Sequence, residues 1–327
     1  MKIGLRAAWV AALLTSLVAV SSAGATPPGK NGVIVYDVYN PRIDAGDLYV
    51  VDAPGRPPRP LVATKADEYA ASWSPDGKTL AFARILPGRG QAAIYLADAH
   101  GRHVRKLIGG DRWYINPSWS PDGKRIAFYS DRDFPRPGGN QQPPPPEIYT
   151  IGIDGKSLRR LTHNRAMDWD PIWAPDGKTL AFFSNRDARP GSSLNIYLIG
   201  ADGSNARRVT RIGGRSEWNP SFAPDGQTLV YETAAHDGRQ SDIWLIGRNG
   251  HHARPLITGP RWETNPVWSP DGNQIAFTSD RQAAGARDRE NAYFELWVMD
   301  LQSKSLERLT HDRLPTLYPE WQPHPAA

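Results

Sequence analysis

Short runs of apolar residues, separated by clusters of Gly, Pro and Asp, recur along the chain and predict β-strands joined by tight turns. Each repeat opens with an aromatic residue, here called the anchor, which stands two residues before the Pro of a Pro-Asp-Gly turn. The anchors are Trp73, Trp119, Trp173, Phe222 and Trp268, and a degenerate sixth copy begins at Trp321. Their spacings of 46, 54, 49, 46 and 53 residues predict one β-propeller blade per repeat.

Three further strands are predicted after each anchor. The first ends in an aromatic residue: Phe82, Phe128, Phe182, Tyr231 and Phe277. The second contains an aliphatic–aromatic pair: Ile94-Tyr95, Ile148-Tyr149, Ile196-Tyr197, Ile243-Trp244 and Leu296-Trp297. The third ends in an aliphatic residue that follows basic ones: Leu107, Leu161, Val209, Leu256 and Leu309. Each repeat therefore has four strands, which we call A to D in chain order.

The two ends of the repeat region combine into one more blade. A B strand at Val33 to Tyr36, a C strand containing Leu48-Tyr49 and a D strand containing Leu61 precede the first anchor, and Trp321 begins an A strand without a sequel. We therefore predict an all-β fold over residues 30–323, followed by a tail at 324–327. This fold is a six-bladed β-propeller of four-stranded blades, closed by one C-terminal strand that joins three N-terminal strands. Such sharing leaves no free sheet edge at the closure.

The first 25 residues have the pattern of a cleavable signal peptide. Lys2 and Arg6 precede an apolar stretch, Ala7 to Val20, that is too short to span a bilayer comfortably, and residues 23–25 fit a small-x-small cleavage site. Cleavage after residue 25 would lower the formal charge from +5 to +3. We expect an exported, periplasmic or secreted monomer without a transmembrane segment, whose modest charge does not indicate nucleic-acid binding.

Signatures of catalysis are missing from the sequence. The chain has no Cys, which excludes disulfides and thiolate zinc sites, and it has no Gly-x-Ser-x-Gly or His-Glu-x-x-His motif. His163 and His311 stand at equivalent positions after strand D, which favours a role in loop structure. We expect a binding protein without a required cofactor rather than an enzyme.

Strand A lines the channel of a propeller, and the D–A and B–C loops open on one face of it. Carboxylates five or three residues before the anchors should gather at this channel mouth: Glu68, Asp168, Asp170, Glu217 and Glu263. A hard cation such as Ca²⁺ would offset their repulsion, as would Arg112, Arg215 and Arg261, which stand two residues before the position five before the anchor. Alternatively, Asn and Asp residues three before the anchor cap the loop backbone.

The same segments combine aromatic residues with Arg, as binding interfaces do. These candidate partner-binding residues are Tyr69, Arg112, Trp113, Tyr114, Trp169, Trp218, Arg261 and Trp262. The alternative is that the aromatic rings pack between blades. Two long B–C insertions, at 131–146 and 281–291, are expected to stand above this face.

The Trp-Ser-Pro-Asp-Gly anchors, together with Ser130-Asp131-Arg132 and Ser279-Asp280-Arg281 after strand B, resemble the WD40-like propeller repeats of TolB proteins. This resemblance implies a periplasmic protein that binds an envelope protein, such as a peptidoglycan-associated lipoprotein, through the face with the D–A and B–C loops. TolB proteins carry an α/β domain before the propeller, whereas here the first strand is expected near Val33. The repeats also resemble those of oligogalacturonate lyases, so the alternative function is a carbohydrate-binding protein or carbohydrate-active enzyme, with polysaccharide as the ligand.

Overall fold

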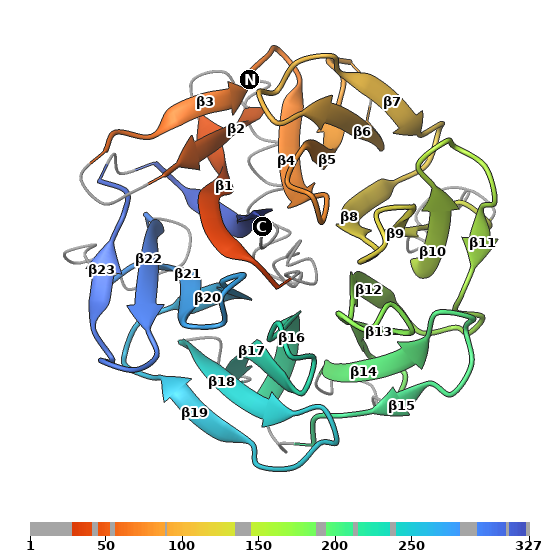
Figure 1. Cartoon of the computed structure of the whole chain (residues 1–327). Coiled ribbons are helices and arrows are strands. Elements are labelled where there is room, and N and C mark those ends of the chain that lie inside the picture. The colour runs from red at the N-terminus through yellow and green to blue at the C-terminus, as the bar shows by residue number, and fades with distance from the viewer. Residues whose placement is uncertain are drawn as a thin grey trace, which may run out of the picture.

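The computed structural model describes residues 28–40, 45–52, 56–88, 90–134, 145–187, 194–211, 215–235, 240–281, 293–311 and 314–324. In these segments, 24 strands form six antiparallel four-stranded sheets around a central axis (Figure 1). No helix among the described residues has the length and apolar character needed to cross a membrane. The predicted signal peptide lies outside the described residues.

Five blades are each built from consecutive strands. Blade 2 contains β4 (Asp67–Trp73), β5 (Thr79–Ile85), β6 (Ala92–Asp98) and β7 (Arg105–Ile108). Blade 3 contains β8 (Tyr114–Trp119), β9 (Arg125–Ser130), β10 (Glu147–Gly152) and β11 (Arg159–Arg160). Blade 4 contains β12 (Asp168–Trp173), β13 (Thr179–Ser184), β14 (Asn195–Gly200) and β15 (Arg207–Arg208). Blade 5 contains β16 (Arg215–Phe222), β17 (Thr228–Ala235), β18 (Ser241–Gly247) and β19 (Arg254–Ile257). Blade 6 contains β20 (Glu263–Trp268), β21 (Gln274–Ser279), β22 (Glu295–Asp300) and β23 (Leu306–Arg308).

Blade 1 joins the two ends of the repeat region, as the sequence predicts. It contains β1 (Lys30–Asn40), β2 (Ala45–Val51) and β3 (Arg59–Val62), with β24 (Thr316–His324) as its innermost strand. β24 pairs antiparallel with β1, so that Ile34 lies opposite Trp321. Because this pairing links strands almost 300 positions apart, it closes the ring by hydrogen bonds rather than by chain connectivity.

The anchors fill the space between neighbouring sheets. Trp73 and Trp173 are almost completely buried, and the buried cluster around Phe222 includes Ile172 of blade 4 and Tyr231 of blade 5. The indole Nε1 of Trp119 donates a hydrogen bond of 3.1 Å to the backbone oxygen of Ser72 in the preceding blade. The anchor side chains therefore hold neighbouring blades together by packing between them.

The turns after the anchors have one repeated geometry. In the first turn, Gly77 has a positive φ of 67°. Its N–H donates to the backbone oxygen of Ser74 at 2.8 Å, and the side-chain hydroxyl of Ser74 donates to Asp76 at 2.6 Å. Gly tolerates this backbone conformation without steric cost, and Pro presets the turn before it. The same hydrogen bond, from the Gly N–H to the backbone oxygen three residues earlier, recurs at Gly123, Gly177, Gly226 and Gly272.

Candidate functional site: the channel and its loop face

A left-handed residue interrupts every innermost strand, three residues before the anchor. These residues have φ between 49° and 55°: Ala70, Asn116, Asp170, Asn219, Asn265 and Tyr318. In blades 2 to 6 the register with the next strand shifts at the same place, which marks a β-bulge. Asn and Asp adopt this conformation more readily than other non-Gly residues, whereas it is unusual for Ala70 and Tyr318.

The bulges connect neighbouring blades at the axis. The side-chain amide of Asn116 donates to Asp170 Oδ1 of the next blade at 2.8 Å. In blade 5, Asn219 donates to Glu232 Oε2 at 2.9 Å, and the backbone N–H of Asn265 in blade 6 contacts the same oxygen at 3.3 Å. The Asn116 side chain bonds to another blade, so it does more than the loop capping considered from the sequence.

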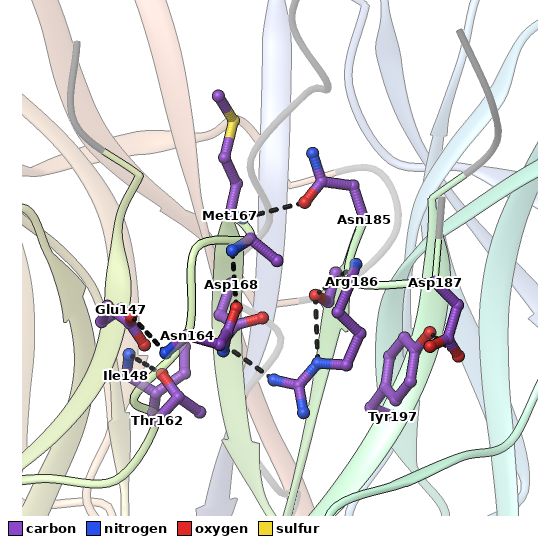
Figure 2. A network of polar contacts seen from close by, with 12 residues as sticks. Glu147, Ile148, Thr162, Asn164, Met167, Asp168, Asn185, Arg186, Asp187 and Tyr197 are labelled. Atoms are coloured by element: carbon purple, nitrogen blue, oxygen red, sulfur yellow. Dashed lines mark hydrogen bonds and ion pairs between the residues drawn. The ribbon is translucent and has the colours of Figure 1, made fainter. Parts of the chain in front are cut away.

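The carboxylates five residues before the anchors are buried, and protein groups already bind them. Glu68 forms an ion pair with Arg84 at 2.8 Å and accepts from the Thr64 hydroxyl at 2.6 Å. Asp168 accepts from Arg186 at 2.8 Å and from Asn164 at 2.7 Å (Figure 2). The corresponding contacts are Glu263 with Arg281 at 2.7 Å, and Glu217 with the Thr210 hydroxyl at 3.0 Å.

Each of these Arg side chains also lies over aromatic rings of its own blade. The guanidinium carbon of Arg186 is 4.8 Å from the ring centre of Phe182 and 4.9 Å from that of Tyr197. Arg84 and Arg281 make the same double contact in blades 2 and 6. The planar guanidinium therefore binds the carboxylate at its edge and the rings with its face.

The expected cation site stays a prediction. Among the described ranges there is no group of three or more His, Asp or Glu side chains that could hold a metal ion. Burial raises the pKa of Glu68 and Glu263, while Arg84 and Arg281 beside them lower it. Glu68, Asp168 and Glu263 thus each have a separate Arg partner in their own blade.

The Arg residues expected to neutralise these carboxylates have other partners. Arg112 lies 3.8 Å from Asp131, and Arg215 binds Asp242. Arg261 lies near Asp280, whose pKa it lowers while burial raises it. Sequence reasoning missed Arg84, Arg186 and Arg281, although the Ser-x-Arg sequence after strand B marks two of them.

Most of the predicted partner-binding aromatics do not project from the surface. Trp169 and Trp218 are each 8 % exposed and belong to one buried cluster, and the Trp169 ring stacks on Phe183 with centres 5.4 Å apart. Tyr114 and Trp262 are also buried. Trp169 lies in β12 and Trp218 in β16, and their burial agrees with the alternative that the rings pack between blades, while their role in partner binding stays a prediction. Part-buried positions are found at Tyr69, Arg112, Trp113 and Arg261.

A cluster of tyrosines and carboxylates occupies the axis instead. Tyr69 of blade 2 and Tyr129 of blade 3 both interact electrostatically with Tyr318 of blade 1. Blades 1 and 3 are not neighbours in the ring (Figure 1), so this influence acts between blades that do not pair with each other. Asp37 lies near Tyr69, and Asp170 near Tyr129. Sequence reasoning identified Tyr69 and Asp170 but missed Tyr129 and Asp37, which lie on B strands.

Exposed apolar side chains lie on both faces of the ring. Tyr293, at 51 %, and Leu86, at 37 %, belong to B–C connections. Val104, Leu158 and Leu306 are 37 to 39 % exposed and lie on the opposite side, at C–D connections. Residues 135–144 and 282–291, which make up most of the two long insertions, lie outside the described residues, so the position of the insertions above the face with the D–A and B–C loops stays a prediction.

Comparisons with known proteins find TolB propellers among the relatives. A family described as "TolB beta propeller domain" matches residues 139–235. "Protein TolB homolog" of Chlorobium luteolum is 33 % identical over 135 residues, which are 41 % of this chain and 29 % of that protein. "Tol-Pal system protein TolB" of Anaeromyxobacter dehalogenans is 30 % identical over 122 residues, which are 37 % of this chain and 26 % of that protein.

The solved structures agree with the fold. The crystal structure of TolB from Acinetobacter baumannii matches 89 % of this chain and 67 % of its own, with a TM-score of 0.69 and 23 % identity. The chain matches less than a third of the length of the two curated relatives above. The shared feature is therefore the propeller.

Proposed function

Because this chain is a TolB-like β-propeller protein, we propose that it is a periplasmic binding module that recognises an envelope protein through its loop face. We define the loop face as the side of the ring that carries the D–A and B–C connections. The partner we propose is a peptidoglycan-associated lipoprotein, in line with the Tol-Pal system named for one relative.

The difference between the two faces supports this assignment. The turns after the anchors repeat one hydrogen-bond pattern in five blades, as expected of structural hairpins. The B–C connections differ in length from blade to blade: they span 41–44 in blade 1, 86–91 in blade 2 and 131–146 in blade 3. Variation of this kind is typical of surfaces shaped for a ligand on a constant scaffold.

The strongest support for the proposal comes from the aromatic and aliphatic side chains on the loop face. Tyr293, on the loop face, is the most exposed large apolar side chain among the described residues. Trp113 is part-buried in a D–A connection, and Leu86 is exposed in a B–C connection. Tyr and Trp are enriched at binding hot spots because they bury a large area at a low cost in conformational entropy.

The test is a titration of the exported protein with the purified periplasmic domain of the peptidoglycan-associated lipoprotein from the same organism. Tyr293→Ala and Trp113→Ala should each weaken binding by about 1–2 kcal/mol if they are hot spots, as isothermal titration calorimetry would show. Val104→Ala and Leu158→Ala are matched controls, since these side chains are also apolar and exposed but lie on the opposite face. Binding lost only in the controls would place the partner on the other face, and no binding by the unaltered protein would refute the proposed partner.

A further inference from the structure

A groove of about 530 Å³ lies on blade 4 where it borders blade 5, on the side of the ring opposite the loop face. Its walls are the turn after the anchor of blade 4, the end of β14 with the turn that follows, the start of β15, and Arg248 of blade 5. Ligand sites in proteins commonly have volumes of about 300–1,000 Å³. The groove is therefore large enough to hold a small ligand.

A small side chain opens the groove in blade 4. Ala201 follows β14 and lines the groove, whereas Ile153 follows β10 in blade 3 and Arg248 follows β18 in blade 5. The backbone is the same in all three blades. Each of these residues donates its N–H, at 2.8 to 3.1 Å, to the backbone oxygen of the residue after the Gly of the anchor turn: Lys124, Lys178 and Gln227. The space therefore comes from the side chain at position 201.

Three basic side chains line the groove: Lys178, Arg207 and Arg248. Arg248 is already bound, since it pairs with Asp176 at 2.8 Å and donates to the Thr179 hydroxyl at 2.5 Å. Arg207 donates one N–H to the backbone oxygen of Arg248 at 2.8 Å, which holds its guanidinium at the border of the two blades. A guanidinium has five N–H donors, so this one bond leaves most of them for a ligand.

The acidic residue beside these cations has other partners. Asp202 alone is acidic among the described residues that line the groove, and its Oδ1 accepts from the N–H and the hydroxyl of Ser204 at 3.0 and 2.7 Å. Arg159 lies beside it and donates to its backbone oxygen at 2.6 Å. No carboxylate in the described part of the chain forms an ion pair with Lys178 or Arg207, and both are exposed. Two positive charges at the groove therefore have no counter-charge.

The groove walls limit the class of ligand. No aromatic ring belongs to the described lining residues, so the groove lacks the surface on which a base would stack. An Arg fork and a Lys ammonium are the side chains that proteins use most for phosphate groups. A phosphate monoester carries a charge of about −1.5 to −2 at neutral pH, which matches the two cations.

We propose that this groove binds a phosphate monoester, with Lys178 and Arg207 as its cationic ligands. Arg207 donates its remaining N–H groups to two phosphate oxygens, and Lys178 donates to a third. The phosphate belongs either to a soluble metabolite or to the headgroup of an anionic lipid. The groove lies opposite the loop face, so this site goes beyond the proposed function and is tested without a protein partner.

The experiment uses the full exported protein and two probes. One is glycerol 3-phosphate, titrated by calorimetry with glycerol as the blank, and the other is sedimentation with vesicles of phosphatidylcholine, alone or mixed with phosphatidic acid. Binding of glycerol 3-phosphate identifies a soluble ligand. Binding only to the vesicles that contain phosphatidic acid identifies a lipid headgroup. Absence of binding in both arms would overturn the proposal.

Two substitutions separate the charge of the site from its space. Lys178→Gln removes one cation from an exposed position, and Ala201→Ile fills the groove with the residue that blade 3 has at this position. Each should weaken binding by about tenfold or more. Lys124→Gln is the matched control, since Lys124 stands at the same turn position in blade 3, and it should leave the affinity unchanged.

Three further results would contradict a phosphate site in this groove. They are an unchanged affinity in both Lys178→Gln and Ala201→Ile, an equal loss in Lys124→Gln, and equal affinity for succinate, a dicarboxylate that lacks phosphate. Thermal unfolding of each variant shows whether it is folded. If Ala201→Ile does not fold, Lys178→Gln with its Lys124→Gln control still decides the question.

Discussion

Among single residues, Arg186 beside strand A makes three kinds of contact at once. Arg186 binds the buried carboxylate of Asp168 (Figure 2). It also lies over Phe182 and Tyr197 and donates to the Ser184 hydroxyl. Its guanidinium replaces the water that Asp168 loses on folding. Removing one partner of such a pair is costly because the other charge stays buried.

We therefore expect Arg186→Leu to destabilise the protein by about 3 kcal/mol, measured by urea unfolding. Asn164 would still donate to Asp168, which keeps the loss from being larger. Arg56→Leu is the control: Arg56 pairs with Asp52 at 3.2 Å but is 70 % exposed, so its loss should change stability by less than about 1 kcal/mol. Equal effects of the two substitutions would contradict a structural role for the buried pair.

The raised pKa of Asp37 makes a prediction about pH. The folded protein keeps the Asp37 proton to a higher pH than the unfolded chain does, so it binds more protons in the interval between the two pKa values. Its stability contribution is therefore present at low pH and is lost as pH rises through the folded pKa. Asn at this position cannot ionise.

Relative to the unaltered protein, Asp37→Asn should gain stability as pH rises from about 4 to about 7, as unfolding curves at each pH would show. The comparison of two proteins at each pH cancels the contributions of other acidic groups. A stability difference that stays constant over this range would mean that Asp37 titrates with an ordinary pKa.

At the scale of elements, the turn after the anchor explains why blades fold alike. Ser120 donates to Asp122 and accepts from the Arg125 N–H at 2.9 Å, which fixes both sides of the β8–β9 turn. Blade 4 has Ala174 at the same position, and its turn still forms through the Gly177 N–H bond to Ala174. The hydroxyl therefore adds stability to a turn that Pro, Asp and Gly already favour.

We expect Ser120→Ala to cost about 1 kcal/mol and Ala174→Ser to gain up to about 1 kcal/mol in the free energy of unfolding. The two changes are reciprocal, since each gives one blade the turn of the other. Thermal unfolding with the same baseline treatment would measure both. A loss of stability in Ala174→Ser would show that the blade 4 turn has no room for the hydroxyl.

At the scale of the whole molecule, β24 determines whether the ring is closed. It pairs with β1, and Trp321 packs in one buried cluster with Ile34 of blade 1 and Val267 of blade 6. Further bonds tie the start of β1 to blade 6, including Gly29 N–H to the Pro270 oxygen at 3.0 Å. The closure thus joins blades 1 and 6 through side chains as well as strand pairing.

Deleting residues 315–327 should cause a large loss of thermal stability or aggregation, because β1 then has an unpaired edge and blades 1 and 6 lose Trp321 between them. Deleting residues 325–327 alone, beyond β24, is the control and should have little effect. Differential scanning calorimetry and light scattering would distinguish the two proteins. An unchanged melting temperature after the longer deletion would contradict closure by β24.

The sequence by itself determined the number of blades, the four strands in each, and the closure through Trp321, because these depend on local turn chemistry and on a regular repeat of apolar residues. It also located strand A at the axis and two of the axial residues, Tyr69 and Asp170. It did not determine where Trp169 and Trp218 would point, or which groups would bind Glu68 and Asp168.

Those outcomes were decided by the tertiary structure. A bulge three residues before each anchor changes which side chains of strand A face the channel and which face a neighbouring blade. The hydrogen bonds from Ala70 N–H to Asp37 and from Asn116 to Asp170 each join residues of two blades that are more than 30 positions apart in the chain. Such contacts depend on ring closure and on small shifts in register. They cannot be predicted from residue spacing or from the hydrophobic pattern.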